Sequence, residues 1–158
     1  MISHPFPPLY NEHSKVLILG SFPSVKSREQ LFFYGHPQNR FWKVLSAVFE
    51  SETPKTIDEK KAFLLKNNVA LWDVIASCEI SGSADSTIRN VTPNDLTPIL
   101  SAANIKKIFV NGKTAEKYYS RYTLPKTAVP AVCLPSTSPA NAACTLPRLV
   151  EAWKQVRT

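Results

Sequence analysis

The sequence predicts an α/β protein: a three-layer α/β/α fold with a four-stranded parallel sheet. Short apolar runs typical of buried strands alternate along the 158 residues with segments whose apolar side chains recur at helical spacing. Short loops rich in Ser, Pro, Asn or Gly follow these runs. Strands that alternate with helices pair with one another in parallel. These loops therefore meet at the carboxyl ends of the strands, where such folds bind ligands.

Four apolar runs are the predicted strands, and they are residues 15–20, 69–72, 107–110 and 129–134. The last run contains Pro130, which lacks a backbone N–H and therefore favours an edge position. Residues 1–14 are expected to form an extended N-terminal segment. Residues 77–90 are polar and Ser-rich and are expected to form a long loop, which in a compact domain is often functional.

Each predicted helix begins at a capping signal. Thr56-Ile57-Asp58-Glu59 is a capping box that opens a helix to residue 66. Pro37 and Asn39 suit the start of a helix over residues 38–49. Three further helices are expected to begin at Thr92, Thr114 and Thr145.

Composition favours a globular protein that binds polyanions. The net charge of +7 and the pI of about 9.4 favour nucleic acid as a partner, although scattered basic residues also suit a solubilising surface. The three cysteines form no CxxC pair, and their odd number indicates reduced thiols and a cytoplasmic location. No membrane-spanning run, phosphate loop, HExxH or GxSxG motif occurs, so we expect no membrane partner, metal or cofactor.

Three segments resemble the uracil-DNA glycosylase superfamily. Gly20-Ser21-Phe22-Pro23-Ser24 is similar to its first signature loop, and Leu134-Pro135-Ser136-Thr137-Ser138-Pro139-Ala140 is similar to its second. Between them, residues 35–44 contain an HPxNRFWKV run that resembles the mismatch-specific uracil/thymine branch. The resemblance implies one DNA glycosylase domain over residues 1–158, acting on DNA without a cofactor.

Two departures from the superfamily pattern indicate a particular branch. Phe22 stands where most members carry the Asp or Asn that positions water, and Leu134 stands where many carry the His or Asn that stabilises the departing base. This combination resembles the hypoxanthine-DNA (deoxyinosine) glycosylase branch. There the catalytic amide belongs to an Asn in the HPxN segment, which implies Asn39 here. From the residues alone, Asn39 could also be a helix N-cap, and its amide could contact either water or the base.

Base-binding residues are expected around an extruded nucleotide. The resemblance favours Tyr34 for stacking, and Phe22 is a second candidate, whereas Phe33 is expected in the core. Asp73 follows the second predicted strand, at a position that in the superfamily often reads the Watson–Crick edge of the base. It could accept the N1–H of hypoxanthine, a ring proton that adenine lacks, or could be a helix cap or a surface acid. Asn111 is a further base-reading candidate. Contacts to DNA phosphates are expected from Ser24, Arg40, Ser136, Ser138 and Asn141.

The expected activity is therefore that of a monofunctional DNA glycosylase for deaminated bases, chiefly hypoxanthine, in base excision repair. Its substrate would be double- or single-stranded DNA, and we expect a monomer. No lysine stands out as a Schiff-base nucleophile, so no lyase step is expected. Two alternatives stay open: a mismatch-specific uracil/thymine-DNA glycosylase, and a non-catalytic DNA- or nucleotide-binding module suggested by the loss of both superfamily catalytic positions.

Overall fold

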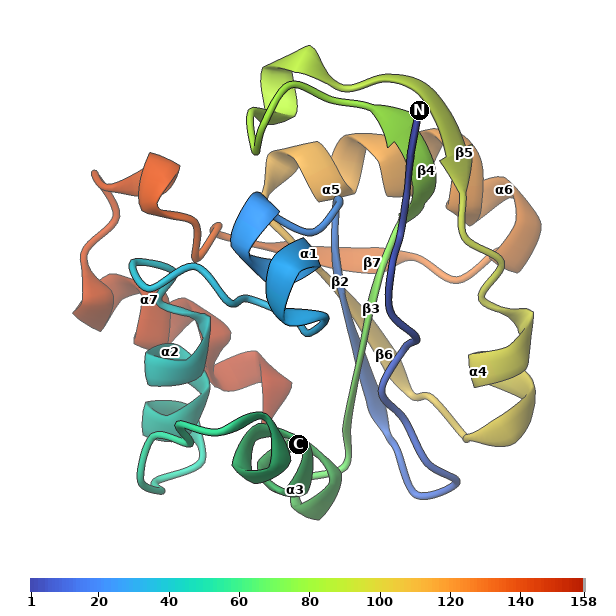
Figure 1. Ribbon diagram of the computed structural model, residues 1–158. Helices are drawn as coiled ribbons and strands as arrows, with labels where there is room; N and C mark the ends of the chain where they lie inside the picture. Colours follow the sequence, from blue (N-terminus) through green and yellow to red (C-terminus); the bar gives the residue numbers. More distant parts are fainter. Residues whose placement is uncertain (158) are drawn as a thin grey trace.

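A four-stranded parallel sheet lies at the centre of the computed structural model, which describes residues 1–157 (Figure 1). The strands are β2 (Val16–Gly20), β3 (Val69–Asp73), β6 (Lys107–Asn111) and β7 (Ala131–Leu134), in the order β3-β2-β6-β7. Every residue of β2 and β3 is buried, as expected for strands covered on both faces. The Pro130 segment leads into β7, which is an edge strand as predicted. The predicted fold class is confirmed.

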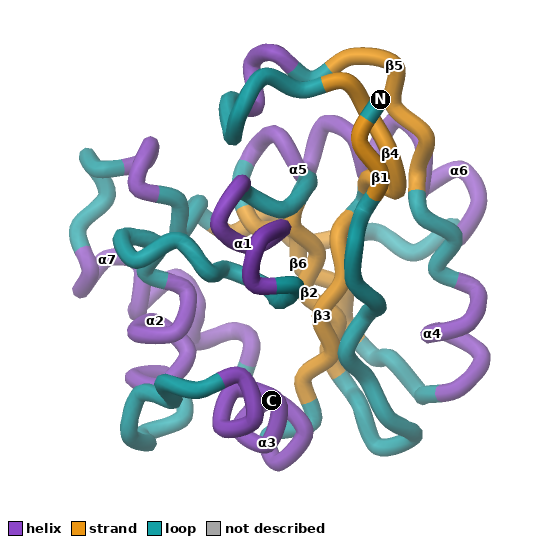
Figure 2. Tube along the Cα trace, viewed as in Figure 1, coloured by secondary structure: helices purple, strands orange, loops and turns teal. Residues whose placement is uncertain are grey.

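Helices cover both faces of this sheet (Figure 2). One group consists of α2 (Phe41–Val48), α3 (Ile57–Lys66) and α7 (Leu146–Trp153), in which α2 packs on α7 and α3 packs on β3. The other group consists of α4 (Thr97–Ala102), α5 (Lys113–Tyr118) and α6 (Leu124–Thr127), and α5 packs on β6 and β7. A short helix that was not predicted, α1 (Val25–Gln30), follows β2. No helix within residues 1–157 is long and apolar enough to cross a membrane.

A second, antiparallel sheet encloses the loop predicted over residues 77–90. It has the order β1-β4-β5 and consists of β1 (Ile2–Ser3), β4 (Ile75–Glu79) and β5 (Arg89–Pro93). Only the tip between β4 and β5 is irregular, and it contains a single 3₁₀ turn, Asp85–Thr87. The loop prediction holds for residues 80–88, but residues 77–79 and 89–90 belong to strands. The strand β5 was missed because it is mostly exposed, so its side chains lack the apolar alternation by which strands are recognised.

Two predicted helix starts were also wrong. Thr92 lies in β5, and α4 begins at Thr97 with a proline in its first turn. The helix after β6 begins before Thr114, because Gly112 occupies the N-cap position with a φ of 92° that favours glycine. It continues through a π-helical segment, Tyr119–Thr123, into α6.

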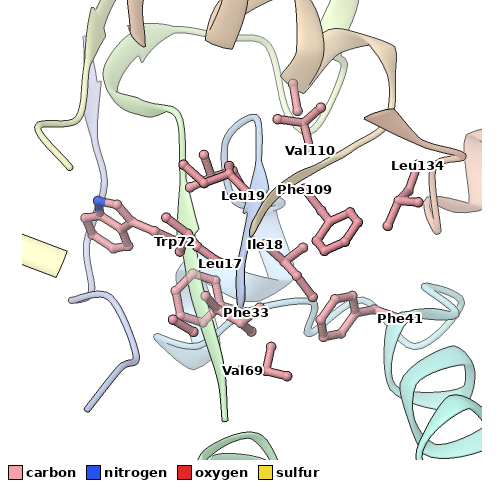
Figure 3. Packing of buried hydrophobic residues seen from close by; sticks show 14 of the residues in the cluster. Leu17, Ile18, Leu19, Phe33, Phe41, Val69, Trp72, Phe109, Val110 and Leu134 are labelled. Carbon is pink, nitrogen blue, oxygen red and sulfur yellow. The ribbon is translucent and has the colours of Figure 1, made fainter. Parts of the chain in front are cut away.

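The core connects the sheet to the segment that precedes α2. Ile18 of β2 and Phe109 of β6 point toward Phe41, the first residue of α2 (Figure 3). All three side chains are fully buried. The start of α2 is therefore fixed against the sheet, which places the preceding residues beside the carboxyl ends of the strands.

Candidate active site

A cavity of about 560 Å³ opens at the carboxyl ends of β2, β3 and β6 and beside the loop after β7. This is the sheet edge where the sequence predicted a site, and the volume is within the usual range for ligand sites. Eight of the predicted site residues line the cavity, and they are Phe22, Ser24, Tyr34, Asn39, Asp73, Asn111, Ser136 and Ser138. Arg40 and Asn141 lie outside its lining.

Asn39 lines the cavity and directly precedes Arg40, which is the N-cap residue of α2, so the alternative that Asn39 is the N-cap was wrong. Its side-chain Oδ1 accepts a hydrogen bond from the backbone N–H of Phe41 at 3.0 Å. The backbone N–H of Asn39 donates to the carbonyl of His36. Helix α2 begins at Phe41, so this contact satisfies one of the unpaired N–H groups of its first turn. The contact also fixes the amide, leaving Nδ2 and the second lone pair of Oδ1 without a partner among the described residues.

Asp73 ends β3 at the cavity floor with only 4% of its surface exposed. Its Oδ2 accepts a hydrogen bond from Nε2 of His4 at 2.7 Å, and both side chains are almost completely buried. Its Oδ1 forms no hydrogen bond within residues 1–157. A buried carboxylate with one paired and one free oxygen can accept a hydrogen bond from a ligand.

Sequence reasoning did not identify His4 as a site residue. Residues 1–14 are not simply an extended segment, because β1 pairs with β4 and the N–H of His4 donates to the carbonyl of Ala76. This pairing brings His4 to Asp73, which is 69 positions away in the chain. No local pattern could have indicated the contact, since it depends on strands β1 and β4.

Tyr34 and Asp73 approach each other over Gly20. A Cβ added to Gly20 would lie 2.5 Å from Oδ1 of Asp73 and 3.1 Å from the hydroxyl oxygen of Tyr34. The Tyr34 ring stacks on Phe41, with centroids 3.9 Å apart. Its buried hydroxyl has no hydrogen-bond partner in the described chain. Burial and the nearby Asp73 carboxylate raise the pKa of Tyr34 far above its usual value, while Asn111 opposes that rise, so the hydroxyl keeps its proton.

The loop after β7 is held to β6 by Asn111. Its Nδ2 donates to Oγ1 of Thr137 at 3.0 Å, and its Oδ1 accepts from the backbone N–H of Thr137 at 3.1 Å. Thr137 is completely buried. Both ends of the Asn111 amide are thus paired inside the protein, which gives this side chain a positioning function in the structure.

Arg40 holds the same loop from the other side. Its guanidinium donates to the backbone carbonyls of Asn141 and Cys144, and its backbone N–H donates to the carbonyl of Thr137. The side chain of Asn141 in turn donates to the carbonyl of Ser136. In this arrangement the guanidinium is engaged by the protein itself, and Arg40 joins the segment before α2 to the second loop.

The predicted serines have local partners as well. Ser24 caps α1 by accepting from the N–H of Ser27, and Ser138 caps a 3₁₀ turn by accepting from the N–H of Ala140. Oγ of Ser136 accepts from the N–H of Ser138. Such contacts order the loops at the cavity, and hydroxyl groups keep further capacity for a phosphate oxygen.

The tip between β4 and β5 forms an additional wall of the cavity, in the loop that the sequence indicated as often functional without identifying its site residues. Residues Ser83, Ala84, Asp85 and Ser86 line the cavity. The tip is held to α1, because Arg28 donates to the carbonyl of Gly82 and the N–H of Val25 donates to Oγ of Ser83. The only sequence signal for this wall was the polar character of residues 77–90.

Comparison with known proteins places this geometry in a family. The family model described as the uracil DNA glycosylase superfamily matches residues 7–157. A protein from Methanosarcina acetivorans named hypoxanthine DNA glycosylase is 34% identical over 143 residues, which is 89% of each chain. A protein of the same name from Methanosarcina barkeri is 32% identical over 115 residues, covering 72% of this chain and 73% of that one.

A solved structure is similar in fold to this protein over the whole length of both chains. It is a solution NMR structure of a candidate uracil DNA glycosylase from Methanosarcina acetivorans, with a TM-score of 0.82, 28% identity and complete coverage of both chains. The family match extends over nearly all of the described residues, including every loop that lines the cavity. The chain therefore belongs to the uracil DNA glycosylase superfamily.

Proposed function

We propose that this protein is a monofunctional DNA glycosylase that releases hypoxanthine from deaminated adenine, as a step of base excision repair. The observation that carries the proposal is that Asp73, whose Oδ1 has no hydrogen-bond partner within residues 1–157, lines the same cavity as Asn39 and Tyr34. Hypoxanthine has a hydrogen on N1, which a carboxylate accepts, whereas adenine presents a lone pair there. The names of the two Methanosarcina relatives support the same substrate.

The base would be held between the aromatic side chains of the cavity. Tyr34 has one ring face covered by Phe41, which leaves the opposite face for the base. Phe22, buried but part of the cavity lining, would contact the base from the first loop. Stacking of this kind grips a nucleotide that has been flipped out of the duplex.

Asn39 would hold the attacking water. The Phe41 N–H occupies one lone pair of Oδ1, and the second lone pair would accept a hydrogen from a water below C1′ of the sugar. The bond between C1′ and N9 breaks, the electron pair leaves with the base, and the water oxygen bonds to C1′. The water loses a proton, and the departing base gains one. The products are free hypoxanthine and an abasic site.

The absence of a lyase step is supported by the cavity lining, which contains no lysine among the described residues. A lyase needs an amine that forms a Schiff base with C1′. We therefore expect the abasic strand to stay intact until alkali is added. Borohydride should trap no covalent complex with the DNA.

Uracil is the second candidate substrate, since its N3–H could also donate to Oδ1 of Asp73. Single-turnover cleavage of duplexes that carry one hypoxanthine or one uracil compares the two. Faster release of hypoxanthine supports the proposal. Faster release of uracil would favour a mismatch-specific uracil glycosylase, and no release from either duplex would favour a binding module without catalytic activity.

A further inference from the structure

His4 occupies an unusual environment for an imidazole. Its side chain is 3% exposed and lies among aromatic rings, with centroids 4.5 Å from Phe6 and 4.4 Å from Trp72. Its only side-chain hydrogen bond within residues 1–157 joins Nε2 to Oδ2 of Asp73. Nδ1 is buried without a partner in this part of the chain. Because an unpaired buried nitrogen costs free energy, a residue kept in such a place calls for an explanation.

The direction of this hydrogen bond follows from the chemistry of its partners. A carboxylate only accepts, so Nε2 carries the hydrogen and donates to Oδ2. With Oδ2 engaged, the carboxylate cannot rotate without breaking a buried charge-assisted bond. Oδ1 is thereby held beside Gly20, and both residues line the cavity.

The orientation of Oδ1 has a consequence for base selection. A fixed carboxylate oxygen attracts a ring N–H and repels a ring lone pair, so it separates hypoxanthine from adenine at N1. Guanine also has an N1–H, but its pairing with cytosine is stronger than any pairing of hypoxanthine, so its extrusion costs more. A carboxylate free to rotate would bind the N–H less well, because ordering it would cost entropy at each encounter.

We propose that His4 is a positioning residue for base selection: it holds the Asp73 carboxylate so that Oδ1 accepts the ring N–H of a deaminated base. This inference rests on the proposed function, since it assigns the means by which the same site recognises its substrate. His4 itself need not touch the base, because it acts through Oδ2 of Asp73.

Two amide variants of His4 provide the test. The side-chain nitrogen of Gln extends to about the position of Nε2, whereas that of Asn is too short to reach Oδ2. His4→Gln should therefore keep the hydrogen bond and His4→Asn should lose it, although both bury an amide in the same place. His13→Asn is the matched control, because the side chain of His13 is 72% exposed and its only charged contact among residues 1–157 is with Glu12 at the surface.

The readout is the affinity for duplexes that carry 2′-fluoro-deoxyinosine or 2′-fluoro-deoxyadenosine, which resist cleavage. We expect the preference for hypoxanthine over adenine to fall about tenfold or more in His4→Asn. It should stay within about threefold of the wild type in His4→Gln and be unchanged in His13→Asn. Melting temperatures show that the variants are folded, and stability alone would not change a ratio of two affinities.

The outcomes separate this inference from the proposed function. The positioning role is wrong if His4→Asn keeps the wild-type preference for hypoxanthine over adenine. It is also wrong if this preference falls as far in His4→Gln as in His4→Asn. Either conclusion holds even when the wild type excises hypoxanthine. If the wild type binds both duplexes equally, base selection by Asp73 is wrong as well. If the wild type selects hypoxanthine but never releases it, the proposed enzymatic function fails while the positioning of Asp73 stands.

Discussion

Gly20→Ala should disturb the cavity at Asp73, because Gly20 and Asp73 both line it. The added Cβ would lie 2.5 Å from Oδ1 of Asp73, a distance that requires the carboxylate to move. Asp73 has little freedom to do so, because its Oδ2 is bound to His4 and its backbone carbonyl accepts from Asn94. The methyl would also lie 3.1 Å from the Tyr34 hydroxyl.

The expected change in the free energy of unfolding of Gly20→Ala is the sum of two opposing contributions. Replacing Gly by Ala stabilises a protein by about 0.4–1 kcal/mol where the backbone allows it, and the φ of Gly20 is not in the left-handed region. Overpacking in a tight site costs about 1–3 kcal/mol. A net loss of about 1–2 kcal/mol corresponds to a fall of roughly 2–8 °C in melting temperature for a chain of this size. Displacing Oδ1 by about 1 Å should slow excision of hypoxanthine about 100-fold.

Thermal unfolding and single-turnover excision would be measured on Gly20→Ala and on Gly82→Ala. Gly82 is the matched control, since its φ of 58° disfavours alanine while no atom lies within 4 Å of the added Cβ. The control should lose similar stability but keep its excision rate within a few-fold. Wild-type excision by Gly20→Ala would refute the conclusion that the position of Oδ1 determines substrate binding.

Substitutions at three further residues test the other contacts around the cavity. Asn39→Ala should slow excision by about 10²–10⁴-fold, while Asn39→Asp, which keeps an oxygen for both Phe41 N–H and water, should retain much more activity in single-turnover assays. An Asp variant as inactive as the Ala variant would instead place the catalytic contact on Nδ2. Asn111→Ala should release Thr137 and lower stability by about 1–3 kcal/mol, measured by urea unfolding, without changing the preference for hypoxanthine over adenine. A changed preference would mean that Asn111 reads the base. Arg40→Lys should weaken binding to every DNA duplex to a similar degree in fluorescence anisotropy, because lysine lacks the fork that holds the carbonyls of Asn141 and Cys144. Unaltered binding would show that the way Arg40 holds the second loop does not contribute to DNA affinity.

The parts of the fold that were predictable are those whose burial leaves a simple pattern. The runs at β2 and β3 are apolar throughout because both faces of the sheet are covered, and Thr56 caps α3 through the N–H of Glu59 as its capping box predicted. In contrast, β5 is paired on one edge and mostly exposed, so its sequence resembles a loop. Gly112 begins α5 through a backbone conformation that a search for side-chain caps does not find.

The site was predictable as a set of loops but not as a set of contacts. Asn39 was expected at the cavity because of its place in the HPxN segment of the branch that the sequence resembles, and Asp73 was expected there because it follows a recognisable strand. Whether Asn111 and Arg40 face a ligand or the protein depends on partners such as Thr137 and Asn141, which come from a distant loop. His4 reaches Asp73 only through the pairing of β1 with β4, a long-range contact without a local signal.

The central claim is that the cavity releases hypoxanthine from DNA through Asn39. The most direct measurement is single-turnover excision by the wild type and Asn39→Ala from labelled duplexes with one hypoxanthine or one uracil, followed by alkali. We predict rapid release of hypoxanthine by the wild type, and its loss in a variant whose melting temperature shows that it is folded. Equal release by both proteins, or no release of hypoxanthine by the wild type, would contradict the claim.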